Sequence, residues 1–127
     1  MTKGYSDQTA GAKVCIDLAT DWALECVETI PRLGKKIFLM DFGAADGGTA
    51  IEFWDKIIRS LSFKGKESHI SLIGNDLYSN DNETLSKNIE LHAANNKLFS
   101  SFLCAGSFYE QLVPSDFLDF GFSATAM

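Results

Sequence analysis

Three short segments of the sequence combine small, acidic and hydroxyl residues in a way that could bind a nucleotide-bearing ligand. The turn at 43–48 is rich in glycine, so a ligand could approach its backbone without obstruction by Cβ atoms. Asp76 could accept hydrogen bonds from ribose hydroxyls. Ser107 and Phe108 could frame an adenine ring by a hydrogen bond and by stacking. Taken singly, each feature also has a structural explanation, as a turn, a helix cap or a core aromatic residue.

The same region contains Asp41-Phe42-Gly43, the letters of the kinase metal-binding motif. A kinase would carry a glycine-rich loop, a strand lysine and a catalytic loop upstream of it, and the sequence before Asp41 contains none of these. We therefore interpret the match as coincidence. The glycine spacing also departs from the dinucleotide fingerprint, which argues against a short dehydrogenase, and the Gly-Lys-Ser/Thr of a P-loop is absent.

The elements that must position these residues follow from hydrophobic periodicity. Short apolar runs predict strands, and segments with three- and four-residue apolar spacing predict helices. The expected strands are 35–42, 69–76, 97–106 and 117–124, and the expected helices are 12–30, 49–63, 80–96 and 107–113. This alternation predicts a parallel sheet with right-handed crossovers. The three candidate segments would then meet where neighbouring strands end, a pattern that suits S-adenosylmethionine.

Several local features are predicted from the same patterns. The helix at 12–30 should bury one apolar face, which includes two thiols. This face consists of Cys15, Leu18, Ala19, Trp22 and Cys26. Capping boxes are expected at Thr49 with Glu52 and at Asn80 with Glu83. His69 and His92 are expected at the surface, away from the strand ends.

Composition limits the classes of function. The chain has 127 residues, of which 46% are hydrophobic, which suits one globular domain. Its formal net charge of −6, with scattered basic residues, argues against nucleic-acid binding. Three widely spaced cysteines give no disulfide framework and no zinc site. The polar N-terminus and the lack of a long apolar run predict a cytoplasmic protein without a membrane segment.

Longer motifs resemble one known family. "MDFGAADGGTA", "IGNDLYSNDNETL" and "GSFYEQLVP" followed by "FSATAM" are similar to the SABATH carboxyl methyltransferases, the salicylate, jasmonate, benzoate and theobromine type with their non-plant relatives. The segments "NDLYSND" and "GSFYEQLVP" match the family pattern at its fixed positions, and the resemblance covers the chain from Tyr5 to Met127. It implies a Rossmann-like methyltransferase fold, S-adenosyl-L-methionine as cofactor and methyl transfer to a small-molecule carboxylate or related nucleophile.

The resemblance also assigns residues by position. Tyr5 and Thr9 would cover the cofactor, and Ser123 would lie under the methyl group. The other implied cofactor contacts are in the turn, after the second strand and after the third: Asp41, Gly43, Ala44, Asp46, Asp76, Leu77, Ser107 and Phe108. Thr125 would line the substrate. The resemblance implies no metal ligand. It also implies a possible homodimer, because members of the family are often dimeric.

The chain departs from the family pattern in four places. Ala12, Ala44 and Thr125 replace a Gln, a Cys and a Tyr, and the His-Trp pair that usually follows Met127 is not in the sequence. The sequence ends directly after an apolar strand, so we interpret residues 1–127 as the N-terminal cofactor-binding part of a methyltransferase, truncated before the later strands and the helical substrate cap.

Two hypotheses follow about what the chain does. It could supply the cofactor-binding half of a carboxyl methyltransferase. Because a carboxylate is already ionised at neutral pH, that reaction needs no general base, and we assign no catalytic residue. Alternatively, the chain could be a non-catalytic paralogue or regulatory binder that pairs with a partner through its exposed strand.

Overall fold

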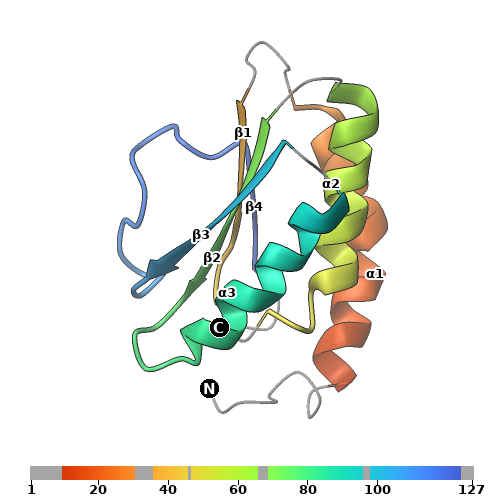
Figure 1. Cartoon of the computed structure of the whole chain (residues 1–127). Helices are drawn as coiled ribbons and strands as arrows, with labels where there is room; N and C mark the ends of the chain where they lie inside the picture. The colour runs from red at the N-terminus through yellow and green to blue at the C-terminus, as the bar shows by residue number, and fades with distance from the viewer. Residues whose placement is uncertain (1–9, 31–35, 46, 66–68, 96–97, 124–127) are drawn as a thin grey trace.

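The computed structural model describes residues 10–30, 36–45, 47–65, 69–95 and 98–123. These residues form the strands β1 (Lys36–Asp41), β2 (His69–Asp76), β3 (Phe99–Ala105) and β4 (Phe120–Phe122), the helices α1 (Ala10–Glu28), α2 (Ile51–Gly65) and α3 (Asn82–Glu90), and the 3-10 helix η2 (Leu91–Asn95). Figure 1 shows the helices on one side of the sheet and the segment 106–119 on the other. Of the helices described, none is long and apolar enough to cross a bilayer.

The described strands make one sheet in the order β3-β2-β1-β4, and every pair is parallel. β1 lies inside the sheet and pairs with β2 from Lys36 opposite His69 to Asp41 opposite Gly74. Because all strands run the same way, their carboxyl ends share one edge. The predicted parallel α/β fold is confirmed.

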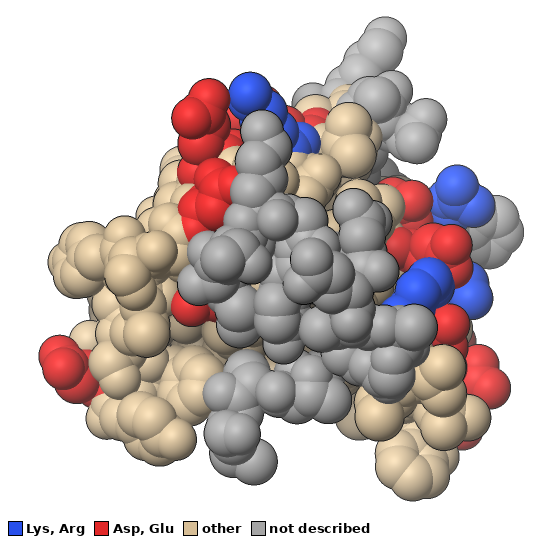
Figure 2. Space-filling view, turned by 90° about the horizontal axis from the view of Figure 1, so that it is seen from below, with Lys and Arg blue, Asp and Glu red and all other residues tan. Residues whose placement is uncertain are grey.

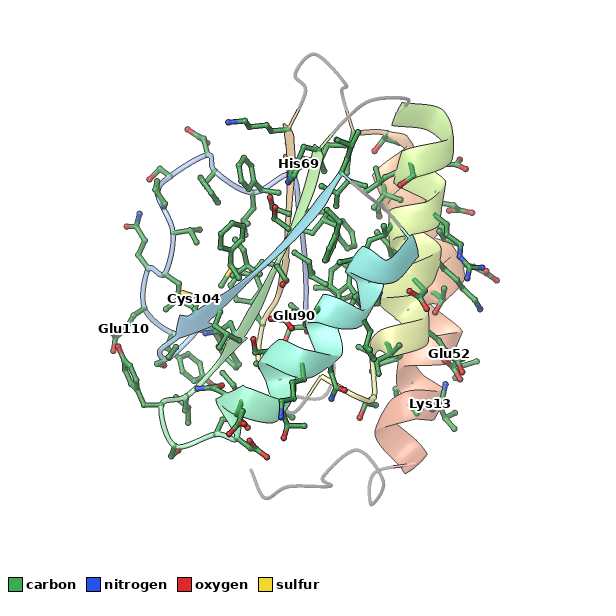
Figure 3. The ribbon with its side chains drawn as sticks, in the orientation of Figure 1. Lys13, Glu52, His69, Glu90, Cys104 and Glu110 are labelled. Atoms are coloured by element: carbon green, nitrogen blue, oxygen red, sulfur yellow. The ribbon has the colours of Figure 1, made fainter. Side chains whose placement is uncertain are left out.

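The core lies between the sheet and its helices. Leu39 of β1 and Leu72 of β2 are fully buried, and Trp54 and Ile57 of α2 pack against the same face. The unbroken apolar run 37–40 on β1 and the continuous burial of β2 between its end residues are expected for strands inside a parallel sheet, where neighbouring elements cover both faces. An ion pair of 3.2 Å between Lys13 Nζ and Glu52 Oε2 links the exposed sides of α1 and α2, as Figure 3 shows.

Helix α1 buries a different face from the predicted one. Its buried residues are Ile16, Thr20, Ala23 and Val27, whereas Leu18 and Trp22 are 76% and 75% exposed. Cys15 and Cys26 are also exposed, so the prediction of buried thiols there is wrong. The sequence carries apolar residues on two adjacent helical stripes, and periodicity alone did not identify the stripe that packs against α2.

Three further predictions about helices need correction. Segment 80–96 is not one α-helix, because α3 ends at Glu90 and the 3-10 helix η2 follows it. Its N-cap is Asp81, not Asn80: the Asp81 carboxylate accepts hydrogen bonds from Thr84 N (3.2 Å) and Thr84 Oγ1 (2.7 Å). The capping box expected at Thr49 with Glu52 is also wrong, because α2 begins at Ile51 and Thr49 therefore does not directly precede its first residue.

The helix predicted at 107–113 is absent, and these residues form turns. Ser107 ends the chain's extended course: its carbonyl accepts a bond from Glu110 N, and its Oγ accepts one from Tyr109 N at 3.2 Å. These bonds close a single turn that does not propagate. The fourth strand is also shorter than predicted, because only Phe120–Phe122 pairs with β1.

His92 is buried rather than at the surface, which contradicts its predicted position. It is 3% exposed, and its Nδ1 lies 2.7 Å from Asp55 Oδ1 of α2. Its ring also meets the Phe99 ring edge-on at 6.0 Å. The histidine therefore ties η2 to α2 and to the start of β3.

Replacing His92 with alanine should lower the free energy of unfolding by roughly 2 kcal/mol, because it removes a buried hydrogen bond to a carboxylate and leaves a small void. Urea denaturation followed by circular dichroism measures this change. In a double-mutant cycle with Asp55→Ala the two effects should not add, since both remove the same contact. Additive effects would contradict the assigned pair.

Candidate functional site

The ends of β1, β2 and β3 meet at Asp76. Its Oδ2 accepts a hydrogen bond of 2.7 Å from Ala45 N in the turn after β1, and its Oδ1 accepts one of 2.7 Å from Leu77 N. Its backbone carbonyl accepts a bond of 2.9 Å from Gly106 N after β3. The predicted proximity of Asp76 to the small-residue turn is therefore confirmed. Asp76 is not the cap of α3, a role that Asp81 fills.

The turn after β1 requires small residues. Gly43, Ala45 and Gly47 all have positive φ angles, of 65°, 56° and 81°. A Cβ on Gly47 would lie 2.9 Å from Leu85 Cδ1, so a larger residue there would also clash with α3. Ala44 is partly buried and packs on the core, and its N–H donates to the Asn75 carbonyl at 2.7 Å. The turn is thus held tightly against β2, with Cβ-free backbone at two of its positions.

Asp41 is the last residue of β1 and precedes this turn. It is 5% exposed, and its Oδ2 accepts a hydrogen bond of 3.0 Å from the indole Nε1 of Trp54. Burial raises the pKa of Asp41 to about 7, against the opposing effect of the Trp54 bond and with a further contribution from nearby Asp76. A carboxyl group at this position therefore titrates near neutral pH.

The end of β3 supplies Ser107 and Phe108. Both are partly buried, and the Phe108 ring lies 4.9 Å from the Tyr109 ring in a tilted arrangement. Gly106 precedes them with φ of 153°, and a Cβ there would lie 2.9 Å from Leu112 Cδ2. The chain can therefore turn sharply after β3 and present Ser107 at the same edge as Asp76.

The remaining predicted residues divide into two groups. Leu77 is half exposed beside Asp76, and Ser123 is exposed directly after β4. A hydrogen bond of 2.9 Å from Phe42 N to the Phe122 carbonyl brings the end of β4 beside the end of β1, so Ser123 belongs to the same edge. The second group lies outside the described residues and consists of Tyr5, Thr9, Asp46 and Thr125.

Two asparagines at this edge were not predicted as site residues. Asn75 is fully buried, and its side chain bonds to Gly43 after β1 and to Cys104 and Gly106 at the end of β3. Asn80 is 8% exposed, and its Nδ2 donates to the Ala45 carbonyl at 2.7 Å. The family pattern in "NDLYSND" contains both asparagines, but only Asp76 and Leu77 of this segment were predicted to contact the ligand, and Asn80 was predicted to be a helix cap.

In the part of the chain that the structure describes, charged and titratable groups away from the strand ends do not extend the site. Figure 2 views the molecule from below, and on its described surface Lys and Arg lie beside Asp and Glu rather than in a separate basic patch. Figure 3 shows His69 at the end of the sheet opposite to Cys104. There, His69 Nε2 lies 2.7 Å from Ser100 Oγ. The strand ends therefore remain the candidate site.

A parallel sheet whose first strand ends in a small-residue turn, with an acidic residue ending the second, defines a Rossmann-like nucleotide-binding domain. The particular family is shown by sequence. A family model described as SAM-dependent carboxyl methyltransferase matches residues 4–127, and the chain belongs to this family. No curated protein sequence matches the chain.

A solved structure described as a loganic acid methyltransferase with SAH has the same fold. The two share a TM-score of 0.79 and 24% sequence identity over 94% of this chain. The match spans 36% of the other protein's chain. At this identity the similarity establishes the fold.

Proposed function

We propose that this chain supplies the cofactor-binding half of a methyltransferase that transfers a methyl group from S-adenosyl-L-methionine to the carboxylate, or a related nucleophile, of a small molecule. Family membership supports the reaction class. The observation that carries the proposal is the position of Asp76, which contacts the turn after β1 by its side chain and the end of β3 by its backbone.

The residues at the strand ends fit an adenosine group. Each Asp76 oxygen accepts one backbone N–H and keeps a further lone pair, which could accept a ribose hydroxyl. In this proposal Ser107 and Phe108 contact the adenine, Leu77 packs beside the ribose, and Gly43 and Ala44 leave room for the methionine portion. Asp41 supports the turn from the end of β1, and Thr125 faces the substrate. The enclosure of the cofactor is completed by four further residues: Tyr5, Thr9, Asp46 and Ser123.

The bound cofactor would supply an electrophilic methyl group on a sulfonium. A carboxylate acceptor is ionised at neutral pH, so no side chain of this chain has to remove a proton. The contribution of the chain is alignment: residues at the strand ends hold the donor in one orientation and exclude water from it. We assign no residue a general acid or base role.

We further propose a cytoplasmic location, supported by cysteines without a disulfide pattern. The acidic net charge of −6 supports a small-molecule partner rather than nucleic acid or an anionic membrane surface. A homodimer is expected from the family resemblance.

Isothermal titration of the chain with S-adenosylmethionine and with S-adenosylhomocysteine tests the proposal. Wild type should bind both, and Asp76→Ala should bind at least tenfold more weakly because the ribose loses its acceptor and the turn loses its anchor at Ala45. Asp21→Ala, a change of the same kind on the exposed side of α1, should bind like wild type. Absence of binding to wild type would contradict the proposal.

A second assay separates the catalytic hypothesis from the non-catalytic one. The chain is incubated with radiolabelled S-adenosylmethionine and a panel of small carboxylic acids, and methyl esters are extracted and counted. Ester formation supports the enzyme. Binding without ester formation supports the alternative, a regulatory binder that pairs through the edge of β4.

A further inference from the structure

The side chain of Asn75 joins the ends of three neighbouring strands. It is fully buried at the end of β2. Its Oδ1 accepts a hydrogen bond of 3.3 Å from Gly43 N after β1. Its Nδ2 donates to two carbonyls at the end of β3, those of Cys104 at 2.8 Å and Gly106 at 3.1 Å. The carboxamide therefore has a partner for its oxygen and for both of its hydrogens.

We propose that Asn75 is a positioning residue that fixes the spacing between the turn after β1 and the end of β3. The inference rests on the proposed function and deepens it. Under that function, Gly43 lies where the methionine portion binds, and Gly106 directly precedes the adenine contacts Ser107 and Phe108. The Asn75 carboxamide would set the distance between the two halves of the ligand site without touching the ligand.

The two anchored residues need such a restraint. Gly43 and Gly106 both adopt positive φ angles, of 65° and 153°. Glycine has more accessible backbone conformations than any other residue, so these positions would otherwise lose order at little cost. Neither has a side chain through which neighbouring residues could hold it. The buried Asn75 side chain fixes each one by a hydrogen bond to its backbone, and at Gly106 it adds to the bond from Gly106 N to the Asp76 carbonyl.

The chemistry of the site favours asparagine over similar residues. Aspartate has nearly the same shape, but it would direct a carboxylate oxygen at the Cys104 and Gly106 carbonyls and lose both donors. Leucine would leave the same two carbonyls and the Gly43 N–H without this partner. Glutamine adds a methylene to a site with no exposed surface.

The test compares the affinities of Asn75→Asp and wild type for S-adenosylhomocysteine and for adenosine, at a temperature where circular dichroism shows both folded. S-adenosylhomocysteine spans both strand ends, whereas adenosine occupies only the Asp76 and Ser107 side. We expect the dissociation constant for S-adenosylhomocysteine to rise at least tenfold, and that for adenosine to rise less. His92→Ala, destabilised at a site far from the strand ends, should change neither.

The outcomes are distinguishable. If wild type fails to bind S-adenosylhomocysteine, the proposed function fails. If wild type binds and folded Asn75→Asp binds within twofold of it, only the positioning role is overturned. An equal loss for both ligands would also overturn it, because the spacing between halves would not matter.

A measurement on wild type covers the case in which Asn75→Asp does not fold. Nuclear magnetic resonance reports hydrogen exchange at the Gly43 N–H and at the Asn75 carboxamide, with and without saturating S-adenosylhomocysteine. Exchange at both should slow at least tenfold more than at the Leu85 N–H of α3, because the ligand and Asn75 stabilise the same arrangement. Equal slowing at all three positions would contradict the inference.

Discussion

Replacing Trp54 with alanine should lower the free energy of unfolding by about 3–5 kcal/mol, the usual cost of truncating a buried aromatic residue. Trp54 is 1% exposed and contacts three aromatic rings, those of Phe53, Phe120 and Phe122, at centroid distances of 5.0, 6.1 and 6.3 Å. The change would also remove the indole N–H that bonds to Asp41 at 3.0 Å. A buried carboxyl group would then lack this donor.

Trp22→Ala is the matched control for this prediction. Trp22 is 75% exposed on α1, so its truncation should alter the unfolding free energy by no more than about 0.5 kcal/mol. Urea denaturation monitored by far-ultraviolet circular dichroism compares the two variants without relying on tryptophan fluorescence. Equal losses for the two would contradict the packing face of α1, and a small loss for Trp54→Ala would contradict the core described above.

The features of the fold that could be predicted from sequence are those set by local pattern. The apolar run within 36–41 is unbroken, and 69–76 is apolar at Ile70, Leu72 and Ile73, so the strand positions follow from local pattern and their parallel arrangement from the alternation with helices. Because parallel strands end at one edge, Asp76 and the turn at 43–48 could be placed together before any coordinates were known. The structure confirms this with the bond from Ala45 N to Asp76.

The features that could not be predicted depend on partners distant in sequence. The two tryptophans have similar surroundings in sequence, yet Trp54 faces the sheet and Trp22 faces outward, because the packing of α1 on α2 selects one of two apolar stripes. His92 is buried only because Asp55, on another helix, lies beside it. Similarly, the turns after Gly106 replace a predicted helix because the Ser107 side chain and carbonyl form local bonds that end it.

The same dependence on partners distant in sequence explains why Asn75 was missing from the predicted site. A carboxylate or a glycine turn suggests ligand chemistry by residue type alone. The role of Asn75 depends on the backbone carbonyls of Cys104 and Gly106, which carry no signal in the sequence. Residues that organise a site through backbone contacts are therefore found from the structure, whereas residues that touch the ligand can be proposed from motifs.

Asp41→Asn should make the protein more stable at alkaline pH, and the gain should depend on pH. The folded-state pKa of Asp41 is raised to about 7 from its ordinary value of 3.8, mainly by burial. Between these two values the folded state binds more protons than the unfolded state, so this group's contribution to stability falls as pH rises. The contribution is fully present below about pH 3.8 and is lost once pH passes about 7.

The shift corresponds to about 4 kcal/mol between the two ends of this range. Asparagine keeps an oxygen that can accept the Trp54 N–H but carries no charge to bury, so the variant should lack this pH dependence. Urea denaturation of both proteins at about pH 4.5 and about pH 8 isolates the effect, because other groups cancel in the difference between them. Asp21→Asn, at an exposed position of α1, should show a difference from wild type that does not change with pH. The advantage of Asp41→Asn could instead be the same at both pH values. The Asp41 carboxyl group would then titrate alike in the folded and unfolded states, and burial of its side chain would not raise its pKa.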